Sequence, residues 1–293
     1  MTGIISGIKR MEIHDGDGLR TTVFFKGCPL KCVWCHNPES IGYEPQTAIF
    51  AEKCIKCGSC VKACPNKAIK LTDHIVKDNS LCNACFACEK VCPTGATVGY
   101  GRRVTVEELF NIVTQDEEFY KNGNGGVTLS GGECLTQPIT IELAKRLKER
   151  GISVDIDTCG YVKRELLTEV MPYTDTFLYD IKAFDPEVHK RCTGHDNHII
   201  LENLKFLSES GCRIEIRYPF VVGYNDSECE RIAEFLSGMK GICGIKVLKY
   251  HDLAASRYAA LGMENTLPKA LTSDEDVESA RDVFRAHGIR VKE

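Results

Sequence analysis

The sequence predicts an α/β fold: a partial (β/α)6 TIM-like barrel that carries a small inserted α+β domain. Two observations support this prediction. From about Thr105 onward, strand and helix patterns alternate, whereas residues 48–100 interrupt the alternation and are dense in cysteine. Repeated strand–helix units imply parallel strands joined by right-handed crossovers. We therefore assign residues 1–47 and 101–293 to the barrel and residues 48–100 to the insert.

Six segments read as buried strands because they are short, apolar and bounded by turn residues. They are Thr21–Lys26, Val127–Ser130, Ile152–Thr158, Thr176–Ala183, Arg213–Tyr218 and Ile245–Tyr250.

The intervening helices have recognisable ends. Thr105 and Glu108 form a T-x-x-E capping box, and apolar residues repeat at helical spacing behind it. Pro138 can open the next helix at its first position, and Gly151 can close it. Further helices are expected near 163–170, 199–210 and 229–236, and a last one starts near Ser273 with an acidic first turn.

Unusual residues follow several of the predicted strands. In barrels of this type the site forms at the C-terminal ends of the strands. Cys28, Gly131, Gly132, Asp157 and His251 stand at such positions. Core packing alone does not readily produce this convergence, so we expect these residues to share one site.

The overall composition is that of an ordinary globular protein, with 43% hydrophobic and 27% charged residues and a formal net charge of -4. The charge does not indicate a nucleic acid or an anionic membrane as a partner. No apolar run is long enough to span a membrane, and residues 1–11 lack the layout of a signal peptide. We therefore expect a cytoplasmic protein.

Cysteine is unusually frequent, with 17 residues, eleven of them in three tight groups between Cys28 and Cys92. A secreted disulfide scaffold would be shorter and would usually pair its cysteines. The regular spacing indicates metal ligation instead. In the first group, Cys28, Cys32 and Cys35 can give three thiolates to a 4Fe–4S cluster and leave one iron open. The alternative is a zinc loop completed by His36.

The other eight cysteines form two copies of C-x2-C-x2-C-x3-C-P, the signature of bacterial two-cluster ferredoxins. In that motif the fourth cysteine ligates the other cluster. The alternative is a pair of zinc knuckles. The expected sets are Cys54, Cys57, Cys60 and Cys92 for one cluster and Cys82, Cys85, Cys88 and Cys64 for the other.

The segments His14–Arg20, Phe24–Cys28 and Cys35–Ser40 resemble the glycyl radical enzyme activating enzymes of the radical SAM superfamily, of the pyruvate formate-lyase activase-like type. The resemblance covers essentially the whole chain, including the ferredoxin-like insert. It implies a radical SAM barrel core that binds S-adenosylmethionine (SAM). The implied reaction cleaves SAM reductively to a 5′-deoxyadenosyl radical, which abstracts a hydrogen from a backbone glycine of a partner enzyme.

The resemblance also implies roles for single residues. The backbone of a Gly-Gly-Glu motif and two aspartates would hold the methionine amino group and, in some members, a monovalent cation. A lysine and an arginine would face the carboxylate, and an asparagine and a histidine would contact the nucleoside. The matching residues are Gly131, Gly132, Glu133, Asp157, Thr158, Asp180, Lys182, Arg217, Asn37 and His251. Taken singly, each could instead be a surface charge, a turn or a packing residue.

The implied partners are a glycyl radical enzyme and a flavodoxin or ferredoxin that would donate electrons through the two insert clusters. This gives three [4Fe-4S] clusters in total. The charged, glycine-rich loop from His14 to Arg20 is the candidate contact with the partner's glycine loop, with Asp15 and Arg20 as its contact residues.

The chain departs from the family at two places. Cys134 stands where Pro usually follows Gly-Gly-Glu, and Asp17 stands where Pro is common. Cys134 is either a tolerated replacement or a further thiol near the site. The scattered cysteines read as small core residues; they are Cys159, Cys192, Cys212, Cys229 and Cys243.

Two other functions fit part of the sequence. A different protein-modifying radical SAM enzyme, such as an anaerobic sulfatase maturase, would also carry extra clusters. Such enzymes usually have a longer cysteine-rich C-terminal region, and here no cysteine follows Cys243. An electron-transfer or iron–sulfur scaffold protein would explain the insert but not Asp157, Asp180, Lys182 and His251.

Overall fold

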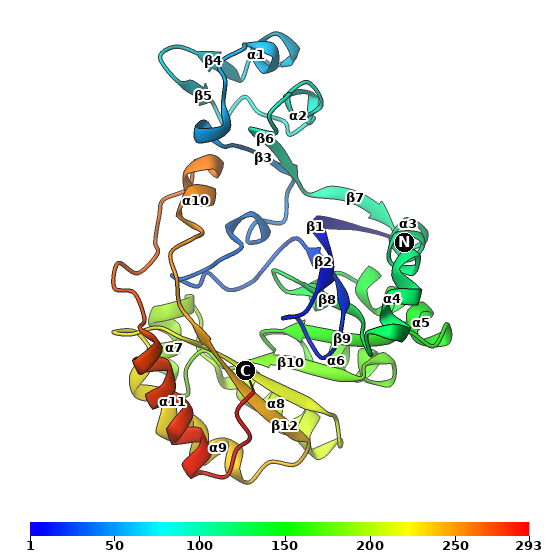
Figure 1. The fold of residues 1–293 in the computed structure, drawn as a ribbon, viewed down its shortest axis with the longest axis vertical. Coiled ribbons are helices and arrows are strands. Elements are labelled where there is room, and N and C mark those ends of the chain that lie inside the picture. Colours follow the sequence, from blue (N-terminus) through cyan, green and yellow to red (C-terminus); the bar gives the residue numbers. More distant parts are fainter. Residues whose placement is uncertain (293) are drawn as a thin grey trace.

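A computed structural model describes residues 1–292 of the chain. Its main feature is an eight-stranded sheet in the order β12-β11-β10-β9-β8-β2-β1-β7 (Figure 1). The strands of this sheet are β1 (Thr2–Glu12), β2 (Arg20–Phe25), β7 (Arg102–Thr105), β8 (Gly126–Gly131), β9 (Ser153–Thr158), β10 (Thr176–Asp180), β11 (Ile214–Phe220) and β12 (Ile242–Lys249).

Six strands, β2 and β8 to β12, pair in parallel: β2 lies beside β8, and each strand from β8 to β11 lies beside the next one along the chain. This confirms the predicted parallel α/β core, and the sheet remains open rather than closing into a full barrel. Two strands were not predicted from the sequence: β1 pairs antiparallel with β2, and β7 pairs antiparallel with β1 at the edge of the sheet. β1 is half-exposed and lacks a continuous apolar run, so its sequence did not indicate a buried strand.

Helices follow the strands and bury apolar residues such as Leu109, Leu147, Leu204 and Phe284 in the main core. The predicted capping box at Thr105 is present, and Ser273 forms a second one with Asp276. Among residues 1–292, no helix has the length and apolar character needed to cross a membrane. The helices are α1 (Ser59–Ala63), α2 (Ala87–Lys90), α3 (Val106–Val113), α4 (Glu117–Asn122), α5 (Ile139–Glu149), α6 (Arg164–Val170), α7 (Pro186–Thr193), α8 (His198–Glu209), α9 (Cys229–Ser237), α10 (Ala255–Leu261) and α11 (Asp274–Ala286).

The cysteine-dense segment forms its own small structure between β2 and β7. β3 (Gln46–Ile49) pairs antiparallel with β6 (Thr97–Tyr100), and β4 (Ile69–Leu71) pairs with β5 (Ile75–Lys77). Figure 1 shows this segment in cyan at one end of the molecule, apart from the main sheet, with α10 next to it. Ala260 and Leu261 of α10 are buried in one apolar cluster with Ala48 and Phe50.

The loop from His14 to Arg20 folds against the sheet. The Arg20 side chain is 2% exposed and pairs with Asp155 of β9, with 3.3 Å between Nη2 and Oδ2. It also donates hydrogen bonds to Thr128 Oγ1 and to the Val127 carbonyl. Arg20 is therefore an internal anchor of the loop. The prediction that it contacts a partner protein is wrong, because its guanidinium does not reach the surface.

Loss of this buried pair should be costly. We expect Arg20→Met to destabilise the fold by about 3–5 kcal/mol, because Asp155 would remain as a buried, unpaired carboxylate. The apparent Tm, followed anaerobically by circular dichroism, should fall by on the order of 10 °C. Arg150→Met is the matched control, since Arg150 pairs with Glu117 on the surface, and its Tm should change little. Equal Tm values for the two variants would contradict this role of Arg20.

Candidate active site

A cavity of about 330 Å³ lies at the C-terminal ends of the parallel strands. This volume falls in the usual range for sites that bind small molecules and cofactors. Its lining comes from the loop after β2 and from the ends of β8, β9, β10, β11 and β12. Of the predicted site residues, the following line it: Asp15, Cys28, Cys32, Cys35, Asn37, Gly131, Gly132, Asp157, Thr158, Asp180, Lys182 and Arg217.

The three thiols of the loop after β2 meet at this cavity. Burial raises the pKa of Cys32 to about 12 and raises that of Cys35 as well. Without iron these two thiols are therefore protonated, and iron binding would release their protons. Three sulfur donors beside an open cavity suit an iron–sulfur cluster with one iron left for a further ligand.

The Gly-Gly-Glu segment packs against the backbone of the cysteine loop. Gly132 N donates to Phe25 O at 2.9 Å, and Glu133 N donates to Gly27 O at 2.8 Å. A Cβ on Gly131 would lie 2.0 Å from Phe25 O, and Gly131 has a φ of +125°, which favours glycine. These two glycines thus allow the ends of β2 and β8 to approach each other.

Glu133 does not line the cavity. Its carboxylate is fully buried, and burial raises its pKa. It accepts hydrogen bonds from Thr158 Oγ1 at 2.9 Å and from Cys159 N at 2.8 Å. In this structure it therefore positions the end of β9, and Thr158, at the cavity wall.

Charged groups of both signs line the cavity at the ends of β9, β10 and β11. Lys182 Nζ is 2.6 Å from Asp180 Oδ2; burial opposes its charge, but this carboxylate raises the lysine pKa well above its ordinary value. Arg217 Nη1 lies 3.8 Å from Asp157 Oδ1 and 3.4 Å from Asp15 Oδ1. Burial raises the pKa of Asp157 to about 7, although the Arg217 charge opposes the shift.

Aromatic rings form the rim near the third cysteine. His36 stacks on His251 with 4.2 Å between ring centroids, and it also lies parallel to Tyr250 at 5.9 Å. His36 and Tyr250 line the cavity, whereas His251 is exposed behind His36. From the sequence, His36 was predicted only as an alternative zinc ligand. Its place directly after Cys35 was the available signal for a ring at the rim.

The departures from the family pattern have local explanations. Cys134 is fully buried in the main core, so it adds no thiol to the cavity. Asp17 is anchored by Arg213 at 2.9 Å and by Lys292 at 2.8 Å, and these ion pairs fix the loop where a proline is common.

Cys159 was predicted to be a core residue. It is indeed buried, but it also lines the cavity, next to Thr158.

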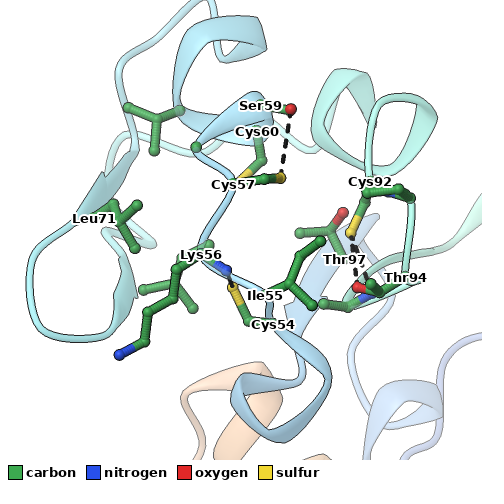
Figure 2. A pocket seen from close by; sticks show the side chains of 15 residues that line it. Cys54, Ile55, Lys56, Cys57, Ser59, Cys60, Leu71, Cys92, Thr94 and Thr97 are labelled. Atoms are coloured by element: carbon green, nitrogen blue, oxygen red, sulfur yellow. Dashed lines mark hydrogen bonds between the residues drawn. The ribbon is translucent and has the colours of Figure 1, made fainter.

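The insert holds two further sets of thiols. Cys54, Cys57, Cys60 and Cys92 surround one small pocket, shown in Figure 2. Cys64, Cys82, Cys85 and Cys88 surround a second pocket. Among residues 1–292, no three His, Cys, Asp or Glu side chains converge on one point like the ligands of a single ion. Each set instead encloses a space, and in each set one cysteine comes from the other sequence repeat.

Comparison with known proteins places the chain in a family. A family model described as the radical SAM superfamily matches residues 22–236. A trans-4-hydroxy-L-proline dehydratase activating enzyme of Clostridioides difficile is 39% identical over 100% of this chain and 99% of its own length. The chain belongs to the activating enzymes of the radical SAM superfamily. Members of this superfamily bind a [4Fe-4S] cluster and SAM.

A second activating enzyme is similar over nearly the full chain, and a solved structure shares the fold. A choline trimethylamine-lyase activating enzyme of Oleidesulfovibrio alaskensis is 37% identical over 98% of this chain and 96% of its own length. Streptococcus suis SuiB, solved with its precursor peptide SuiA, has a TM-score of 0.58 at 13% identity, covering 91% of this chain and 46% of SuiB. At that identity the likeness shows the fold alone.

We expect the titration of Asp157 to govern SAM affinity, because the family resemblance assigns its carboxylate to the SAM ammonium group. With a pKa of about 7, Asp157 is mostly protonated at pH 6 and mostly ionised at pH 8. Only the carboxylate can accept a charge-assisted hydrogen bond from the SAM ammonium group. We therefore expect the SAM dissociation constant, measured by equilibrium dialysis, to fall roughly tenfold from pH 6 to pH 8.

Asp157→Asn is the control, because it keeps the titration of SAM itself and removes that of the protein group. We expect this variant to bind SAM more weakly at pH 8 and to lose most of the pH dependence. The same pH profile in both proteins would exclude Asp157 as the titrating group.

Proposed function

We propose that this chain activates a glycyl radical enzyme by forming a radical on one of its backbone glycines. The observation that carries the proposal is one cavity that brings together the three-thiol loop, two aspartates, a lysine and an arginine. Support comes from relatives named as activating enzymes that match nearly the full length of the chain. Their targets differ at similar identity, so the shared motifs reflect a shared reaction.

In this proposal Cys28, Cys32 and Cys35 hold the catalytic [4Fe-4S] cluster. When bound, the cluster supplies the electron that cleaves SAM into methionine and a 5′-deoxyadenosyl radical, which takes a hydrogen atom from the glycine Cα. The chain itself binds and orients SAM and keeps water away from the radical.

The remaining cavity residues would bind the two charged groups of the methionine part of SAM, its ammonium and its carboxylate. An ammonium needs acceptors, and a carboxylate needs a cation. We assign Asp157 and Asp180, with the backbone of Gly131 and Gly132, to the ammonium and to a monovalent cation. We assign Lys182 and Arg217 to the carboxylate. Glu133 and Thr158 support this wall, and Asn37 and His251 serve the nucleoside end, His251 through the ring of His36.

Asp15 remains the candidate contact with the partner's glycine loop. Its carboxylate lines the cavity and is held by Arg217 Nη1 at 3.4 Å and by Thr22 Oγ1 at 3.0 Å. A glycine segment entering the cavity would therefore meet a fixed acceptor for its backbone N–H groups.

We further propose that the insert is a ferredoxin-like domain, residues 48–100, that holds two auxiliary [4Fe-4S] clusters. The two pockets support this, because each is enclosed by three cysteines of one repeat and the fourth of the other. That crossed pattern is the one expected for bacterial two-cluster ferredoxins. With the catalytic cluster, the chain would hold three.

The electron donor in this proposal is a flavodoxin or ferredoxin that docks on the insert. Residues 48–100 contain seven lysines and four acidic residues, whereas the whole chain has a formal charge of -4. Six of these lysines are exposed and would be available to pair with acidic groups of a carrier. Cys57 and Cys85 are exposed, so each auxiliary cluster would have an edge near the surface.

Glycyl radical formation tests the main proposal. After anaerobic incubation with SAM, dithionite and candidate glycyl radical enzymes, we expect a glycyl radical signal by electron paramagnetic resonance on at least one of them. Cys35→Ser should give neither this signal nor 5′-deoxyadenosine. Production of 5′-deoxyadenosine without a glycyl radical on any candidate would instead favour an enzyme that modifies other side chains, such as a sulfatase maturase.

Replacing one ligand of each auxiliary cluster tests the electron route. Cys57→Ala and Cys85→Ala should slow flavodoxin-driven cleavage of SAM and leave dithionite-driven cleavage nearly unchanged, because dithionite can reduce the catalytic cluster directly. Cys212→Ala, outside the insert, is the control, and iron content reports the loss of each cluster. A flavodoxin-driven rate equal to wild type would rule out the relay.

A further inference from the structure

Helix α10 contacts the cysteine loop through two neighbouring side chains. Tyr258 donates its hydroxyl hydrogen to Cys35 O at 3.1 Å. Arg257 Nη1 lies 3.0 Å from His36 O, 3.1 Å from Asn37 Oδ1 and 3.1 Å from Glu39 Oε1. The Arg257 guanidinium therefore hydrogen-bonds to three residues that follow Cys35: the backbone of His36 and the side chains of Asn37 and Glu39.

The contact with Asn37 fixes the orientation of its amide. A guanidinium group has only hydrogen-bond donors, so the Asn37 atom that faces Arg257 must be the oxygen. The amide nitrogen is then left as the donor that Asn37 can offer to the cavity, which it lines. The ring nitrogens of adenine and the ribose oxygens are acceptors, so this orientation suits a nucleoside.

We propose that Arg257 is a positioning residue that holds Asn37 with its NH2 group toward the nucleoside of SAM. This inference rests on the proposed function, in which the cavity binds SAM. Glu39 supports the arrangement, because its buried carboxylate pairs with the same Arg257 Nη1 atom at 3.1 Å.

The C-terminal end of α10 packs on the insert. Leu261 and Ala260 are buried against Ala48 of β3 and Phe50 directly after it. The insert thereby supports the helix that carries Arg257. It contributes to SAM binding through packing, independently of any electron that it transfers.

A double-mutant cycle on SAM binding tests this role. The dissociation constant is measured by equilibrium dialysis on oxidised protein, which does not turn over. Arg257→Met and Asn37→Ala should each raise it roughly tenfold, as expected for a lost charge-assisted hydrogen bond and a lost ligand contact. The double variant should bind no more weakly than Asn37→Ala, because Arg257 acts through Asn37.

Further variants separate positioning from a general structural effect. Arg257→Lys, which keeps a donor, should restore part of the affinity. Asn37→Asp keeps the contact with Arg257 but offers an acceptor to the nucleoside, so it should bind SAM at least as weakly as Asn37→Ala. Leu261→Ala should raise the dissociation constant less than Arg257→Met does. Arg285→Met, which removes a paired arginine from α11, is the matched control and should bind like wild type.

The possible outcomes are distinct. If Arg257→Met binds SAM like wild type, or adds its full effect to that of Asn37→Ala, the positioning role is refuted and the proposed function stands. If wild type itself binds no SAM, the proposed function and this inference fall together. Iron content equal to that of wild type in each variant shows that a weaker affinity does not come from cluster loss.

Discussion

The parallel pairing of six consecutive strands is the constraint on which the rest of this structure depends. Because β2 and β8 to β12 run in the same direction, their C-terminal ends meet at one edge of the sheet. Residues separated by nearly two hundred positions, such as Cys28 and Arg217, thereby line one cavity. The close approach of Gly131 and Gly132 to the loop after β2 then joins the cysteine loop to the neighbouring strand end.

That edge concentrates charge in a buried place, which is costly for folding. Arg217 is almost fully buried and is the cation that Asp15 and Asp157 share, whereas Glu215 nearby also pairs with Lys292. Burial raises the pKa of Asp157, and the negative charges of Asp180 and Asp15 raise it further, although Arg217 opposes the shift. Strongly shifted pKa values of this kind are typical of functional sites. A ligand that brings its own ammonium group would relieve the imbalance.

Much of the fold could be predicted because its signals are local. The capping box at Thr105 and the buried strands depend on neighbours in sequence, and they were predicted with small boundary errors. Pro138, for example, precedes α5 as its N-cap instead of opening it. The strand ends then indicated which residues would meet. Arg20 shows the limit of this approach, because a charged residue in a glycine-rich loop suggests exposure, and only the position of Asp155 on β9 reveals a buried pair.

The contacts made by α10 could not be predicted for the same physical reason. Arg257 meets Asn37 across 220 residues, and no periodic pattern records such a pair. The helix is short, and its two faces serve different neighbours: Arg257 and Tyr258 bind the cysteine loop, while Leu261 packs on the insert. Loosening this packing would disturb the loop that holds Cys35 and Asn37. The insert and the cysteine loop are therefore connected through α10. A mutation that loosens α10 from the insert is expected to weaken SAM binding at the cysteine loop.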